Sequence, residues 1–198
     1  MMRRSLALGG AVIAIAIFAG TPRAGAGPDP QAFVNELGTQ AIRVLGPSIP
    51  APQRLARFRE LFRNDFDIAG IGQFVLGRYW RTATPAEQQE FLRLFQEYIV
   101  QAYSARLGEY GGEPFRVTGS RNAGGEIVVA SQVVRQNGAP VSVDWHLIDQ
   151  GGALKITDVY VGGVSMKVTE RDEFGAVIQR NGGQVEALLA QLRKKVGS

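Results

Sequence analysis

Two different spacings of hydrophobic residues divide the chain into helical and strand-rich parts. In the first half, apolar side chains recur every three or four positions, as they do on one face of an amphipathic helix. This spacing predicts helices over residues 31–46, 52–67 and 85–108. Residues 68–80 are also apolar, but glycines interrupt them, so we expect a less regular helix there.

From residue 114 the hydrophobic period changes to two. Alternating runs predict strands over residues 114–120, 126–136, 140–149 and 153–161. Short turn sequences such as "NGAP" and "QGG" separate the last three runs and are typical of hairpins. Helical spacing returns after residue 169 and again over 184–196. The order predicts an α+β fold in which helices pack on one face of a twisted antiparallel meander sheet.

Two helix starts have recognisable capping residues. Thr84, Pro85 and Glu87 form a capping box, in which the threonine oxygen and the glutamate side chain each accept a backbone N–H. Thr169 with Asp172 predicts a second helix start near the C-terminus.

The N-terminal residues have the features of an export signal. "MMRR" is basic, an apolar run follows, and Ala24-Gly25-Ala26 fits a small-residue cleavage site. We therefore expect residues 1–26 to be removed and residues 27–198 to form a single domain. Three arginines leave with the signal, which takes the formal net charge from +4 to +1 and argues against a nucleic-acid partner. The chain has no cysteine to carry a lipid anchor or a disulfide, so we expect a soluble periplasmic protein.

The residues offer little for catalysis. One histidine and no cysteine argue against a transition-metal site, and no cofactor is expected. The polar side chains that could serve an enzyme in a cavity are Asp144, Asp158 and His146, and no nucleophile motif accompanies them. The chain is instead rich in apolar and aromatic residues, which fits either a filled core or a cavity between helices and a curved sheet.

Two blocks of the sequence resemble the MlaC family, also called the toluene-tolerance family. The first is "VLGRYWRTATPAEQQEFLRLFQEYIVQAYSARLGEYGGEPFRV", residues 75–117, with its aromatic pair and its A-T-P-A-x-Q helix start. The second is "ITDVYVGGVSMKVTERDEFGAVIQRNGGQVEALLAQL", residues 156–192. Both blocks keep the order and spacing of the family, and together they cover most of residues 27–198.

This resemblance implies a periplasmic phospholipid carrier that performs no covalent chemistry and helps maintain outer-membrane lipid asymmetry. The phospholipid is the cargo, and its acyl chains lie in an apolar cavity of an α+β fold similar to an NTF2-like cone. The implied partners are an inner-membrane ABC-transporter complex with an MCE-domain subunit and an outer-membrane lipoprotein–porin complex.

Within the two blocks, the face of the helix or strand on which each side chain lies predicts the residues that line such a cavity. The predicted lining residues are Leu76, Trp80, Phe95, Tyr98, Trp145, Val159, Val161, Val164, Met166 and Phe174. Gly162 and Gly163, with Met166, are expected to form a flexible lip.

Three other functions remain open from the sequence. The cargo could be a hopanoid or another polycyclic lipid, since a branch of the family is linked to hopanoid pathways. The cavity could hold an enzyme's active site, or the interior could be solid and the protein an adaptor between envelope complexes.

Overall fold

The computed structural model describes residues 27–45, 48–108, 113–135 and 138–197. The predicted export signal lies outside these residues. The described elements are α1 (Pro30–Leu45), α2 (Ala51–Asp65), α3 (Ile68–Leu76), a 3-10 helix (Gly77–Arg81), α4 (Pro85–Gly108), β1 (Phe115–Ala123), β2 (Glu126–Val133), β3 (Val141–Asp149), β4 (Leu154–Val161), β5 (Val164–Ser165), α5 (Met166–Arg180) and α6 (Val185–Val196). Among them, no helix combines the length and hydrophobicity needed to cross a bilayer.

The strands form one antiparallel sheet in the order β1-β2-β3-β4-β5. Each strand pairs with the next one along the chain, so the predicted meander and the α+β class are confirmed. The short β5 adds a fifth strand, because Val164 pairs back onto Val161 across the Gly162-Gly163 turn. Both glycines have positive φ angles, 58° and 82°, which side chains with a Cβ rarely adopt.

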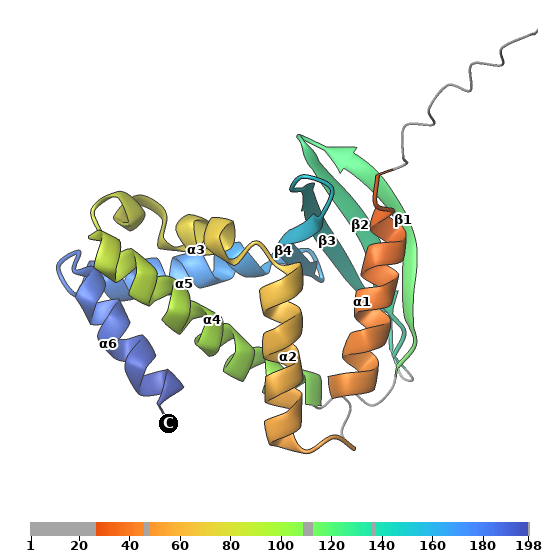
Figure 1. The fold of residues 1–198 in the computed structure, drawn as a ribbon, viewed down its shortest axis with the longest axis horizontal. Coiled ribbons are helices and arrows are strands. Elements are labelled where there is room, and N and C mark those ends of the chain that lie inside the picture. The colour runs from red at the N-terminus through yellow and green to blue at the C-terminus, as the bar shows by residue number, and fades with distance from the viewer. Residues whose placement is uncertain (1–26, 46–47, 109–112, 136–137, 198) are drawn as a thin grey trace, which may run out of the picture.

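Two hydrophobic cores occupy the two ends of the molecule (Figure 1). In the first, α1 lies across the curved sheet and buries Val34 and Leu37 against Val129, Leu147 and Ile156. The second lies among the helices α3 to α6, with α2 alongside them. We expected the helices to pack on one face of the sheet. In the structure mainly α1 does so, whereas most other helices bury their apolar faces against one another.

The capping box of α4 is present as predicted. The Glu87 N–H donates to Thr84 Oγ1 at 3.2 Å, and the Thr84 N–H donates to Glu87 Oε2 at 2.8 Å. The glycine-rich segment 68–80 divides at Gly77, whose φ of 58° ends α3 and starts the 3-10 helix.

The predicted start of α5 at Thr169 is wrong. Ser165 is the N-cap, and its Oγ accepts the Val168 N–H at 3.1 Å. The helix begins earlier because Asp158, on the neighbouring strand β4, accepts the Ser165 hydroxyl at 2.5 Å and the Lys167 N–H at 3.1 Å. Thr169 instead donates its hydroxyl to the Ser165 carbonyl.

Candidate functional site

A cavity of about 580 Å³ lies between the sheet and the helices. Its described lining residues are Gly38, Ala41, Ile42, Phe58, Phe62, Phe66, Ile71, Phe95, Ile99, Tyr103, Phe115, Val133, Val143, Trp145, Thr157, Asp158, Val159, Val161, Met166, Lys167 and Glu170. Most of these side chains are apolar or aromatic. The volume is within the range of about 300–1,000 Å³ that is usual for binding sites of small molecules.

The sheet side of the cavity is built around an aromatic pair. Phe115 and Trp145 meet edge to face with ring centroids 6.3 Å apart. The Trp145 indole N–H donates to Ser131 Oγ at 2.9 Å, so its one polar atom is satisfied and the ring remains available to the cavity. Gly38 of α1 lies directly against Phe115, since a Cβ at this position would come within 2.4 Å of the ring.

Another part of the cavity wall is a row of phenylalanines on α2 and just beyond it. Phe58, Phe62 and Phe66 are spaced four residues apart, which places them on one helix face. Their rings contact in sequence, with centroid separations of 6.2 and 4.7 Å. A bidentate ion pair holds α2 on α4, because Arg59 donates to both carboxylate oxygens of Glu97 at 2.8–3.2 Å. The hydrogen bond to Glu97 raises the pKa of the Arg59 guanidinium.

The polar lining residues gather where β4 meets the start of α5. Asp158 is buried and accepts three hydrogen bonds, from the Ser165 hydroxyl and from the backbone N–H groups of Val159 and Lys167. Thr157 donates to Glu126 Oε1 at 2.7 Å. Asp158 and Thr157 thus bond to the protein itself. Apart from Tyr103, Lys167 and Glu170, the other described lining residues are apolar or aromatic.

Five of the ten predicted lining residues do line the cavity. They are Phe95, Trp145, Val159, Val161 and Met166. They come from α4, β3, β4 and the start of α5, so the structure brings both sequence blocks to the same cavity.

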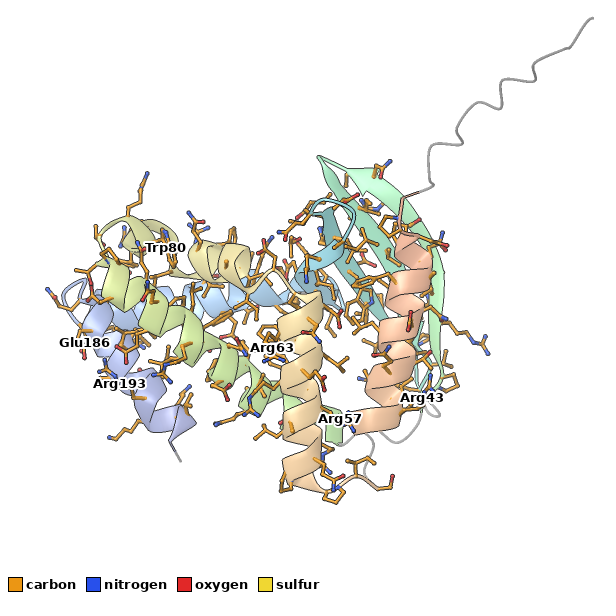
Figure 2. All side chains as sticks on the ribbon, viewed as in Figure 1. Arg43, Arg57, Arg63, Trp80, Glu186 and Arg193 are labelled. Atoms are coloured by element: carbon orange, nitrogen blue, oxygen red, sulfur yellow. The ribbon has the colours of Figure 1, made fainter. Side chains whose placement is uncertain are left out.

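The other five lie elsewhere. Trp80 sits in the helical part of the molecule, away from the sheet (Figure 2), and packs against the helical core. Leu76 and Phe174 are buried inside that core, and Tyr98 packs at its edge against Phe174. Val164 projects from β5 with 55% of its surface exposed.

These differences have one physical cause. Side-chain phase indicates that a residue is covered, but it does not distinguish a helix–helix contact from a cavity wall. The prediction also omitted α1 and α2, which contribute Ala41 and the phenylalanine row. The four-residue spacing of those phenylalanines was the signal available in the sequence.

The residues considered for catalysis do not all reach the cavity. Of the three, Asp158 reaches the cavity, where its carboxylate caps the start of α5. His146 stacks on Tyr160 with centroids 4.6 Å apart, and its Nδ1 lies 2.9 Å from Glu126 Oε2. Within the described residues, no group of three or more potential ligands is placed to hold a metal ion.

Comparison with known proteins identifies relatives in sequence and a shared fold. The toluene tolerance protein ttg2D of Pseudomonas putida is 29% identical over 160 residues, which are 80% of this chain and 65% of that protein. The intermembrane phospholipid transport system binding protein MlaC of Haemophilus influenzae is 23% identical over 145 residues, covering 69% of this chain and 67% of that protein. The chain therefore spans about two thirds of the length of these relatives.

A solved structure shares the fold. It is a phospholipid-binding protein from Ralstonia solanacearum in complex with a phospholipid, with a TM-score of 0.72 and 24% identity over 86% of this chain and 98% of that one. The profile of the MlaC protein family matches residues 40–194, which include both sequence blocks and every described lining residue of the cavity except Gly38. The chain belongs to the MlaC protein family.

Proposed function

We propose that this protein binds a phospholipid, with its acyl chains in the cavity between sheet and helices, and carries it between membranes. The observation that supports this most directly is the apolar cavity, in a fold shared with a protein solved in complex with a phospholipid. Its lining offers aromatic and aliphatic surface from both ends of the molecule, as acyl chains require.

The energy of lipid transfer explains why the wall is apolar. Each buried CH₂ group is worth about 0.8 kcal/mol, so two acyl chains of ordinary length hold on the order of 20 kcal/mol in a bilayer. A carrier can extract such a lipid only if its cavity replaces most of that burial. The hydrogen bonds within the wall serve this purpose, because an unpaired polar atom against an acyl chain would cost about 1–3 kcal/mol.

We infer that the carrier works in the periplasm, as a single domain released from its export signal. It exchanges lipid with an inner-membrane ABC-transporter complex through an MCE-domain subunit, and with an outer-membrane lipoprotein–porin complex. Family membership and the names of the relatives support these partners. Binding and release of the lipid require no covalent step.

Native mass spectrometry of the purified mature protein tests the cargo. We expect an adduct whose mass and fragments identify a phospholipid. A polycyclic lipid would favour the hopanoid alternative, and protein free of lipid from several expression hosts would contradict the proposal.

A matched pair of substitutions tests the cavity. Val161 is 40% exposed and lines the cavity, whereas Val196 at the C-terminal end of α6 is half-buried and is not among the described lining residues. Val161→Glu should reduce bound lipid several-fold because a carboxylate would face the acyl chains, while its partial exposure lets the protein stay folded. Val196→Glu should keep its lipid. Equal lipid content in the two variants, measured by extraction and phosphate analysis, would argue against this cavity.

A further inference from the structure

The large apolar side chains that are strongly exposed in the described residues gather in one place. They are Val161, Val164 and Val168, at the end of β4, on β5 and in the first turn of α5. Val161 is also the most exposed of the described residues that line the cavity. The cavity wall therefore reaches solvent at the β4–β5 turn, and we take this turn as the mouth of the cavity.

Two cations lie beside this opening on the first two turns of α5. Lys167 lines the cavity, and Arg171 follows one helical turn later on the same face. Both pack on the ring of Phe74 from α3, with Lys167 Nζ 4.9 Å and the Arg171 guanidinium carbon 5.0 Å from the ring centroid.

In the part of the chain that the structure describes, no salt bridge involves Lys167 or Arg171. Asp158 lies on β4, three residues before Val161, and its carboxylate already accepts three hydrogen bonds. The charge of Lys167 helps to lower the pKa of Glu126, but the carboxylate oxygens of Glu126 form hydrogen bonds with His146 and Thr157. Two like charges on one ring repel each other, and an anion between them would relieve that repulsion.

We propose that Lys167 and Arg171 contact the phosphate of the bound lipid at the mouth of the cavity. This inference rests on the proposed function and adds to it the residues that contact the lipid phosphate. The acyl chains extend inward past Trp145 and the α2 phenylalanines, and the phosphodiester stays at the β4–β5 turn. A charged hydrogen bond at the edge of an apolar cavity is stronger than one in bulk water, so the two cations select phosphate-bearing lipids over neutral ones with the same chains.

A competition between two lipids with identical chains tests the assignment. The purified protein is incubated with vesicles of dioleoylphosphatidylglycerol that contain a minor fraction of dioleoylglycerol, and is then re-isolated. Native mass spectrometry gives the ratio of bound phospholipid to bound diacylglycerol, corrected for the vesicle composition. We expect the unmodified protein to prefer the phospholipid, and the Lys167→Gln/Arg171→Gln double variant to lose about tenfold or more of that preference.

The control is Arg180→Gln, which removes one positive charge from the exposed C-terminal end of α5 and should leave the ratio unchanged. An unchanged ratio in the double variant would overturn the inference, and so would an equal loss of both lipids, which would indicate damage to the cavity. Binding of inorganic phosphate that disappears in the double variant, while the lipid ratio stays the same, would assign the cations to free phosphate and also overturn it. If the unmodified protein takes up neither lipid, the proposed function itself fails.

Discussion

Glu126 on β2 is a single side chain that forms hydrogen bonds with two other strands, β3 and β4. Its carboxylate bonds to His146 on β3 and to Thr157 on β4. Burial raises the pKa of Glu126, but the hydrogen bonds from His146 and Thr157 and the charge of Lys167 outweigh burial, so the net pKa lies below its usual value. The ionised form is therefore the one that the folded protein prefers.

This preference predicts a pH-dependent contribution to stability. The contribution is present above the unfolded pKa of about 4.3 and is lost as the pH falls through the lower folded pKa. Glu126→Gln should lower the free energy of unfolding by about 1–2 kcal/mol at pH 7. Urea unfolding of both proteins at a series of pH values should show that the difference shrinks below about pH 4. A constant difference down to pH 3 would contradict the assignment.

Among the elements, α4 connects the two ends of the molecule. It begins at the capping box of Thr84, contributes Phe91 and Phe95 to the helical core, and carries Glu97, which holds α2. Phe95 also lines the cavity. At its N-terminal end, Glu90 bonds to Arg193 of α6 at 2.7 Å, and this hydrogen bond lowers the pKa of Glu90. α4 thus binds α6 near its N-terminal end, through Glu90, and α2 in its middle, through Glu97.

Removal of the cap should weaken the whole fold rather than one turn. Thr84→Ala leaves the Glu87 N–H without its acceptor and should cost about 1 kcal/mol of stability, measured by urea unfolding. Thr84→Ser keeps the hydroxyl and serves as the control. Equal midpoints for the alanine and serine variants would show that the cap does not stabilise the protein.

At the scale of the whole molecule, the cavity exists because the two cores do not merge. One core joins α1 to the sheet and the other joins α3 to α6, with α2 between them (Figure 1). Gly38 of α1 lets the Phe115 ring approach the helix closely, and the small Ala41 on the same helix lines the cavity.

Filling the cavity should separate lipid binding from folding. Ala41→Phe places a ring among apolar neighbours and should reduce bound lipid several-fold without lowering the melting temperature, since burial of an aromatic ring is worth about 1.5–3 kcal/mol. Ala32→Phe, at the exposed start of α1, is the matched control. Thermal unfolding and lipid extraction measure the two effects, and full lipid content in Ala41→Phe would show that the acyl chains lie elsewhere.

The sequence by itself determined the elements and their order, because hydrophobic period and capping residues act within a few positions of the chain. The period of two over residues 114–161 predicted the meander, and Thr84 with Glu87 predicted the start of α4. The two family blocks predicted membership of the MlaC family, which the profile match shows.

Only the tertiary structure decided which covered residues face a cavity and which fill a core. The sequence predicted both Trp80 and Trp145 as lining residues, yet Trp80 packs on helices and Trp145 lines the cavity. The start of α5 depended on Asp158, on a different strand, and the pairing of Lys167 with Arg171 on one ring depended on α3. These outcomes arise from contacts between segments far apart in the chain, and local periodicity carries no information about them.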